Sequence, residues 1–281
     1  IDLIPAGSTM SWVNQALLGV ADREARKNRT KAHGAWFIDV FNETYFRTRP
    51  ANIGKNAMAE AEFTSQILEL GRGRKRVLDV GGGYGRIALP LARTGAEVTL
   101  LDLSKDMIAM ALSLGETRKV ELKTIHLDMR DLAFESEFDS VRCGGSTFGY
   151  FSDAENLMLM SRLCHSVKPG GRVLIDVMNR DRVIQDLPNR GWWEGDGCLI
   201  QEDADFDLMK SRVDVKRLLV FSDGTQREAM ISIRLFSIHE LAEMMNLVGL
   251  RVVDVTGTPQ TEGTFFTTQS QRLMVTAQRI R

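Results

Sequence analysis

Cysteine is scarce in this chain, and the few residues present form no disulfide or metal pattern. The 281 residues include three cysteines, Cys143, Cys164 and Cys198, and no C-x-x-C pair. An odd number of widely spaced cysteines argues against a disulfide scaffold and a structural zinc site, and favours a reducing compartment. Residues 1–10 also lack the basic segment followed by an apolar stretch that marks a signal peptide. We therefore expect a cytoplasmic protein.

Long apolar runs and a surplus of positive charge are missing as well. No apolar run reaches the ~18 residues needed to cross a bilayer, which excludes a membrane-spanning helix. The 36 Lys and Arg residues face 37 Asp and Glu residues, for a formal net charge of −1. Proteins that bind nucleic-acid backbones usually carry a basic excess, because phosphate neutralisation drives their affinity. The sequence therefore predicts neither a membrane nor a nucleic acid as partner.

What is present is the composition of a soluble globular protein, with 43% hydrophobic and 26% charged residues. From residue 76 onward, short apolar segments alternate with segments of helical spacing, an arrangement typical of a parallel sheet with helices on both faces. We predict an α/β fold built on a doubly wound, mostly parallel seven-stranded sheet. The strands are expected at 76–80, 97–103, 120–128, 138–143, 172–178, 251–257 and 272–280, and the helices at 87–95, 105–115, 153–167 and 238–249.

Two parts of the chain depart from this alternation. Residues 1–70 are predicted to be helical, since apolar side chains recur at helical spacing from Ala59 to Leu70. We expect them to form an N-terminal cap or lid over a core at 71–281. Residues 211–221 and 227–236 alternate around a Ser-Asp-Gly-Thr turn, which predicts an antiparallel hairpin. That hairpin belongs to an insertion at about 190–237, between the fifth strand and the next helix.

The sharpest motif is VLDVGGGYGRIALPLA at residues 77–92, where a strand runs into four glycines and then a helix. Glycines permit positive φ angles and let a ligand lie against bare backbone. The N-terminus of the following helix adds free N–H groups and partial positive charge. In a doubly wound sheet, ligands bind at the carboxyl ends of the strands. The motif therefore predicts a cofactor site.

An acidic residue extends this site. Asp102 ends the second predicted strand, 19 positions after Gly83. A carboxylate at this spacing can accept hydrogen bonds from both hydroxyls of a ribose, which indicates an adenosine-like ligand. Two cofactor classes fit so far. Gly83, Gly85 and Ala88 match the dinucleotide pattern G-x-G-x-x-A, whereas Asp79 to Gly85 matches D-x-G-x-G-x-G.

The second pattern and its surroundings resemble the seven-stranded, Rossmann-like (class I) methyltransferases that depend on S-adenosylmethionine (SAM). Asp128 follows the third strand, KPGG at 168–171 precedes the fifth, and the last two strands close the chain, as in that family. GSTFGYF at 145–151, and the stretch from Trp193 through RLFS at 234–237 to QRL at 271–273, look like a subgroup acting on small molecules. The resemblance covers roughly residues 40–281. It implies SAM as cofactor and methyl transfer to an N or O atom of a metabolite or natural-product intermediate.

The resemblance also implies a set of site residues. The cofactor set comprises Asp79, Gly81, Gly83, Cys143 and Gly144 for the methionine end, Asp102 for the ribose, and Leu103, Asp128 and Met129 for the adenine. These contacts need no cation, so no metal site is expected. Aromatic and polar residues of the lid, the strand ends and the insertion are hypothesised to bind the acceptor: Trp36, Tyr45, Phe148, Tyr150, Asn179, Trp193 and Arg234, with Trp192 beside them. His33 is the candidate general base.

Several alternatives stay open at this level. The chain could be an RNA or protein methyltransferase, a SAM-binding protein with non-methylating chemistry, or a nicotinamide-dependent oxidoreductase, because a fold does not decide its function. The identity of the acceptor and the choice between monomer and homodimer are not encoded in any motif.

Overall fold

The structure, a computed structural model, describes residues 35–50, 54–71, 74–187, 189–261 and 263–280. Residues 36–281 form one compact unit, to which the following description refers. His33 lies outside the described residues. Within the described ranges, no helix is long and apolar enough to cross a membrane.

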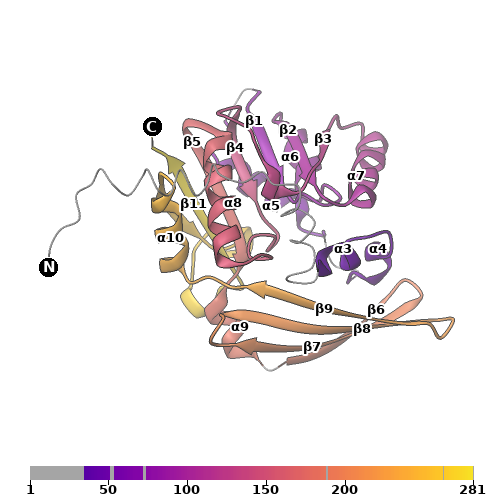
Figure 1. The fold of residues 1–281 in the computed structure, drawn as a ribbon. Coiled ribbons are helices and arrows are strands. Elements are labelled where there is room, and N and C mark those ends of the chain that lie inside the picture. Colours follow the sequence, from indigo (N-terminus) through magenta and orange to yellow (C-terminus); the bar gives the residue numbers. More distant parts are fainter. Residues whose placement is uncertain (1–34, 51–53, 72–73, 188, 262, 281) are drawn as a thin grey trace, which may run out of the picture. The chain divides into compact units, whose positions relative to one another are not determined.

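The main sheet has seven strands in the order β10-β11-β5-β4-β1-β2-β3 (Figure 1). They are β1 (Arg76–Val80), β2 (Glu97–Asp102), β3 (Lys123–His126), β4 (Phe138–Cys143), β5 (Val167–Met178), β10 (Leu250–Thr256) and β11 (Arg272–Arg279). Strand β11 runs antiparallel to both β5 and β10, and the other pairings are parallel. This confirms the predicted sheet and its reversed final pair. Strand β5 starts earlier than expected, because the KPGG segment belongs to it as a bulge, across which the register with β4 shifts.

Helices cover both faces of this sheet. They are α5 (Ala57–Ile67), α6 (Ala88–Arg93), α7 (Lys105–Arg118), α8 (Asp153–Ser166) and α10 (Ile238–Leu247). Apolar residues of α5, α6 and α7 pack with Val77 and Leu100 on one face, whereas those of α8 and α10 pack with Leu78 and Val141 on the other. Burial on both faces explains why the strands are continuous apolar runs.

Serine residues begin three of these helices at the edge where the parallel strands end. The Ser104 hydroxyl accepts a hydrogen bond from the backbone N–H of Met107 in α7. Ser152 and Ser237 each form a reciprocal capping box with the glutamate three residues later, at α8 and α10. These caps satisfy backbone N–H groups that a helix cannot pair internally.

The insertion is larger than the predicted hairpin. It is a four-stranded antiparallel sheet of β6 (Asn189–Gly195), β7 (Cys198–Asp207), β8 (Arg212–Phe221) and β9 (Gln226–Arg234), preceded by helix α9 (Arg180–Asp186). Strands β8 and β9 are the predicted pair. Strands β6 and β7 escaped prediction because β6 contains two glycines and the second half of β7 is rich in acidic residues, so neither shows a clear alternation.

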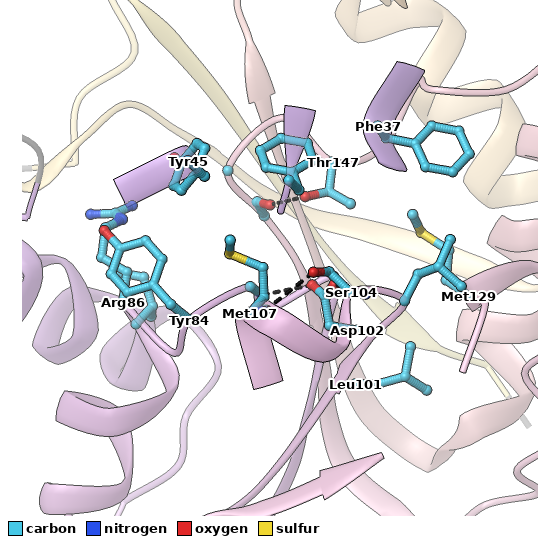
Figure 2. A pocket seen from close by; sticks show the side chains of 18 of the residues that line it. Phe37, Tyr45, Tyr84, Arg86, Leu101, Asp102, Ser104, Met107, Met129 and Thr147 are labelled. Carbon is cyan, nitrogen blue, oxygen red and sulfur yellow. Dashed lines mark hydrogen bonds between the residues drawn. The ribbon is translucent and has the colours of Figure 1, made fainter. Parts of the chain in front are cut away.

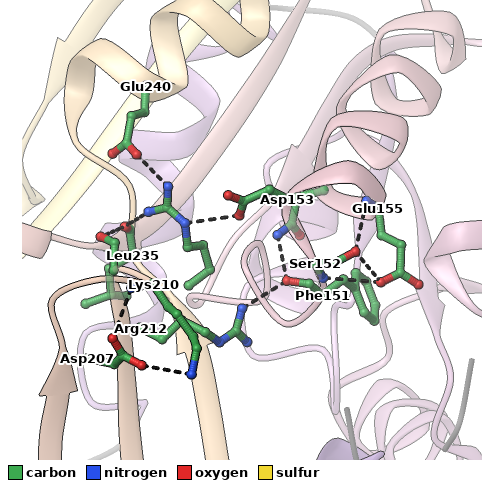
Figure 3. A network of polar contacts seen from close by, with 12 residues as sticks. Phe151, Ser152, Asp153, Glu155, Asp207, Lys210, Arg212, Leu235 and Glu240 are labelled. Atoms are coloured by element: carbon green, nitrogen blue, oxygen red, sulfur yellow. Dashed lines mark hydrogen bonds and ion pairs between the residues drawn. The ribbon is translucent and has the colours of Figure 1, made fainter. Parts of the chain in front are cut away.

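The inserted sheet is fixed to the loop that follows β4. The Arg212 guanidinium donates to the carbonyl oxygen of Phe151 at 3.0 Å (Figure 3). The backbone N–H of Arg234 donates to the Gly149 carbonyl oxygen at 2.8 Å. Gly149 has a φ of +114°, and a Cβ there would lie 2.3 Å from the Arg234 carbonyl oxygen. Only glycine therefore allows the strand to approach so closely.

Two short helices of the N-terminal part, α3 (Trp36–Val40) and α4 (Tyr45–Thr48), precede α5. Helix α3 contacts β9, and α4 contacts β6 and β7. The helical prediction for residues 36–70 is thus confirmed over three separate helices, and residues 1–34 of that prediction fall outside the described part of the chain.

A substitution of Phe148 tests the packing beneath the loop that follows β4. Its side chain is fully buried, and its ring centroid lies 5.4 Å from that of Phe236. We expect Phe148→Ala to lower the free energy of unfolding by about 3–5 kcal/mol, since it removes a large buried ring and leaves a cavity. Urea denaturation measures this change, with Phe266→Ala as control because Phe266 is half exposed. Equal stability of the two variants would contradict the packing role.

Candidate active site

A cavity of about 770 Å³ opens where β1 and β2 end. Its wall combines the glycine loop after β1, the end of β2, the loop after β4, and helices α3 and α4. Figure 2 shows Tyr45, Tyr84 and Arg86 at one end of this cavity and Phe37 and Met129 at the other. The cavity therefore lies at the carboxyl edge of the sheet, where doubly wound folds bind ligands.

The glycine loop is tied to β2 through its backbone. The N–H groups of Gly81 and Gly82 donate to the Leu101 carbonyl oxygen at 2.8 and 3.1 Å. Gly83 has a φ of +58°, and a Cβ there would meet no atom within 4 Å. The loop thus presents bare backbone to the cavity, with room for a ligand beside Gly83.

Asp102 joins this loop to the start of α7. Its two carboxylate oxygens accept hydrogen bonds from the N–H groups of Gly83 and Ser104, each at 2.8 Å. Burial raises the pKa of Asp102 and outweighs these two N–H donors, which lower it. Each oxygen keeps lone-pair capacity for a further donor. A ligand with two adjacent hydroxyls would satisfy that capacity and compensate the buried charge.

The remaining residues of the predicted adenine site lie together. Leu103, Asp128 and Met129 all line the cavity. The Asp128 carboxylate is held by Arg130, whose Nη2 donates at 2.7 Å, and Arg130 in turn pairs with Glu155. This pairing fixes the orientation of the carboxylate at the cavity wall.

A buried charge network underlies the opposite end. Arg142 of β4 donates to Asp79 Oδ1 at 2.7 Å and lies 3.5 Å from Asp176 Oδ2, and Arg272 Nε donates to Asp176 Oδ1 at 2.6 Å. Within the described residues, Asp79 Oδ2 and Arg142 Nε are buried without a hydrogen-bond partner. Leaving such groups unpaired is costly. Arg142 lines the cavity, so a polar ligand at this wall would compensate its guanidinium charge.

Aromatic rings line the part of the cavity formed by α3, α4 and the loop after β4. Tyr45 and Tyr150, both predicted, line it. Phe37 and Phe41, which the sequence analysis did not single out, line it too, with rings within 12° and 14° of parallel to that of Tyr150. Trp36 packs behind them, 4.6 Å from the Tyr150 ring. Burial raises the pKa of Tyr150, so this hydroxyl stays protonated.

Other predicted positions lie away from the cavity. The Asn179 side chain donates to two backbone carbonyl oxygens before β11 and caps α9. Arg234 pairs with Asp153 and with Glu240, a contact marked in Figure 3. The side chains of Asn179 and Arg234 therefore pair with other groups of the fold and do not face the cavity.

Phe148 belongs to the core, Cys143 is buried within β4, and Trp193 contacts α4. Of the predicted cofactor residues, Asp79 reaches the cavity wall only through Arg142, whereas Gly81, Gly83 and Gly144 line it directly. Within the described ranges, no group of three or more His, Cys, Asp and Glu residues could hold a metal ion.

Two ion-paired arginines at the cavity also escaped the sequence analysis. Arg86 makes two hydrogen bonds of 2.9 Å with Glu60. Arg142 is a charged residue next to the carboxyl end of the strand FDSVRC, where ligands bind in such sheets, and that position is a signal that could have identified it. Arg86 is harder to identify from the sequence, because its partner Glu60 lies on α5, 26 positions earlier.

The Arg272–Asp176 pair makes stability depend on pH. Burial alone would raise the pKa of Asp176, but Arg272 and Arg142 hold it below the ordinary value. A lowered folded-state pKa contributes stability above the ordinary pKa of about 4, and that stability is lost as the pH falls through the folded value. We expect Arg272→Gln to cost about 3 kcal/mol at pH 7, near the lower end for breaking a buried pair.

The difference between wild type and Arg272→Gln should shrink on acidification, because protonated Asp176 needs no cation. Urea denaturation at neutral and acidic pH measures it. Arg251→Gln is the control, since Arg251 is exposed on β10. A difference that stays constant with pH would show that the loss is one of packing alone.

Comparisons with known proteins agree with this geometry. Residues 77–171 match the family model described as a methyltransferase domain. A Geobacillus sp. protein named as a methyltransferase is 34% identical over 156 residues, which span 54% of this chain and 59% of that protein. A glycine/sarcosine N-methyltransferase from Halorhodospira halochloris is 25% identical over 72% of this chain and 74% of its own length.

Solved structures share the fold over most of the chain. The CcbJ methyltransferase from Streptomyces caelestis superposes with a TM-score of 0.72 at 20% identity, covering 87% of this chain and 96% of that one. The sugar N-methyltransferase KedS8 from Streptoalloteichus gives 0.62 at 21% identity, covering 82% and 90%. The family resemblance is thereby confirmed: this chain carries a methyltransferase domain on the seven-stranded fold of the class I SAM-dependent methyltransferases.

Proposed function

We propose that this protein transfers a methyl group from SAM to an N or O atom of a small-molecule acceptor. The observation that carries the proposal is the single cavity wall on which the glycine loop, Asp102 and the loop after β4 meet. This wall offers bare backbone, a carboxylate for two hydroxyls and buried charges of both signs, which are the features a nucleoside joined to an amino acid requires.

The residues present fit SAM at both ends. Asp102 would hold the ribose hydroxyls, and Leu103, Asp128 and Met129 would hold the adenine. The amino-acid end carries an ammonium and a carboxylate. Arg142 lines the cavity and is complementary to that carboxylate, and Asp79 supports Arg142 from behind the wall.

The bound cofactor would supply an electrophilic methyl group on a sulfonium. The chain's own task is then to place the acceptor atom in line with that group and to keep water away. We propose that Phe41, Tyr45 and Tyr150 do this, since their rings cover the cavity beside the loop after β4. Residues 36–70 would accordingly act as a cap on the core at 71–281.

The names of similar proteins support a small acceptor and both acceptor atoms. They include glycine/sarcosine N-methyltransferase, ubiquinone biosynthesis O-methyltransferase and a sugar N-methyltransferase. The enclosed aromatic wall favours a small molecule over a polymer, because a macromolecular substrate needs an open groove. The small-molecule acceptor itself is to be identified by screening amines and phenols.

The cofactor proposal is tested at Asp102. We expect calorimetric titration to show binding of SAM and S-adenosylhomocysteine to the wild type, and Asp102→Ala to weaken both by about tenfold to a hundredfold. Removing a charged acceptor from a buried hydrogen bond has an effect of this size. Asp254→Ala is the matched control, because Asp254 is exposed on β10.

Three results discriminate between the remaining functions. Binding of NAD(H) in place of SAM would overturn the proposal and favour an oxidoreductase. Formation of S-adenosylhomocysteine in equal amount to a methylated acceptor would support methyl transfer. Cofactor turnover without any methylated product would instead indicate non-methylating chemistry.

A further inference from the structure

Helix α4 cannot hold its own position at the cavity. It has four residues, and its N-cap Thr44 makes no side-chain capping bond. A helix of one turn is unstable without tertiary contacts, because nucleation costs more than so few hydrogen bonds return. Yet Tyr45, its first residue, lines the cavity. Contacts from another part of the chain must therefore fix α4.

The turn between β6 and β7 supplies the first of these contacts. The backbone N–H of Asp196 donates to the Arg47 carbonyl oxygen at 2.7 Å, and the Arg47 side chain donates back to the Asp196 carbonyl oxygen at 3.1 Å. A Cβ on Gly195 would lie 2.0 Å from the Arg47 carbonyl oxygen. Only glycine allows the turn to approach the helix so closely.

Trp193 supplies the second contact. Its indole Nε1 donates to the Thr48 carbonyl oxygen at 2.7 Å. Thr48 ends α4, and the last carbonyl groups of a helix have no partner within the helix. The neighbouring Trp192 is 68% exposed, as expected for alternation along β6. The two tryptophans therefore differ in role although they are adjacent.

On its inner side, the segment that the turn holds contacts the glycine loop. Arg49 Nη1 donates to the hydroxyl oxygen of Tyr84 at 3.0 Å, and its guanidinium lies 5.1 Å from the centre of that ring. The Phe46 ring meets Tyr84 edge to face at 5.1 Å, and Tyr45 lies 6.3 Å from it. Tyr84 sits between Gly83 and Gly85, so the contact reaches the cofactor wall.

We infer that Trp193, Gly195 and Asp196 form a clasp by which the inserted sheet presses α4 onto Tyr84 of the glycine loop. Trp193 and Gly195 are thus positioning residues: they act on the cofactor wall through α4 without touching the cavity. The insertion, which is far from the glycine loop in sequence, becomes part of the cofactor site. The inference rests on the proposed function for the identity of the ligand.

Gly195→Ala tests the clasp. We expect faster hydrogen exchange of the backbone amides in residues 42–49, and an affinity for S-adenosylhomocysteine about fivefold lower, the effect of losing one hydrogen bond. Gly191→Ala is the matched control. Gly191 lies in the same strand, and a Cβ there would meet nothing within 4 Å. Exchange in β1 and β4 should stay as in the wild type, which separates a local effect from general destabilisation.

Trp193→Phe is the milder variant, since it keeps an aromatic ring while it removes the N–H donor and part of the indole, and Trp192→Phe makes the same change in size. We expect the same two changes, with Trp192→Phe behaving as the wild type. If Gly195→Ala does not fold, the comparison of Trp193→Phe with Trp192→Phe still tests the clasp.

Equal exchange of residues 42–49 and equal affinity in the clasp variants and their controls would overturn the inference. The exchange measurement needs no ligand. If the wild type bound no S-adenosylhomocysteine, the proposed function would fail, while the exchange of residues 42–49 would still support or refute the clasp.

Discussion

The pair of hydrogen bonds at Asp102 is the contact on which the cavity depends. One carboxylate oxygen holds Gly83 of the loop after β1, and the other holds Ser104, the N-cap of α7. The floor of the cavity is therefore set by a side chain at the end of β2, and the parallel pairing of β1 with β2 brings loop and carboxylate together. A buried carboxylate that is already oriented loses little freedom when hydroxyl groups bind to it, so binding energy goes into the ligand contacts.

Two close contacts between backbone segments position the inserted sheet, as the Asp102 hydrogen bonds position the glycine loop. Gly149 lets β9 lie against the loop after β4, and Gly195 lets the β6–β7 turn lie against α4. At both places a side chain would separate the inserted sheet from the element it supports. Helices α3 and α4 are too short to be stable alone, so the positions of their rings depend on contacts with the inserted sheet and with the loop after β4.

The sequence predicted the main sheet because short apolar segments alternate regularly with segments of helical spacing. It predicted that the glycine loop and Asp102 meet at this edge of the sheet, because Asp79 to Gly85 form one contiguous motif with Asp102 at a fixed spacing. It could not place Phe41, whose ring lies against that of Tyr150 in a loop more than a hundred residues away in the sequence. For a polar residue at a strand end, such as Asn179, the sequence does not show whether its side chain binds a ligand or pairs with backbone groups of the fold. In the structure, the Asn179 amide donates to two backbone carbonyl oxygens.

The cavity wall combines buried charges around Arg142 with aromatic rings around Tyr150. Arg142 and Asp79 are almost fully buried, and the desolvation of each is offset by its partner only in part, since one atom of each stays unpaired among the described residues. Arg142 lines the cavity, so a ligand carboxylate would compensate its charge there, whereas Asp79 reaches the cavity wall only through Arg142. On the proposed function, the charged wall would bind the cofactor's amino-acid group by electrostatics, and the aromatic wall would favour an acceptor by shape and apolar surface.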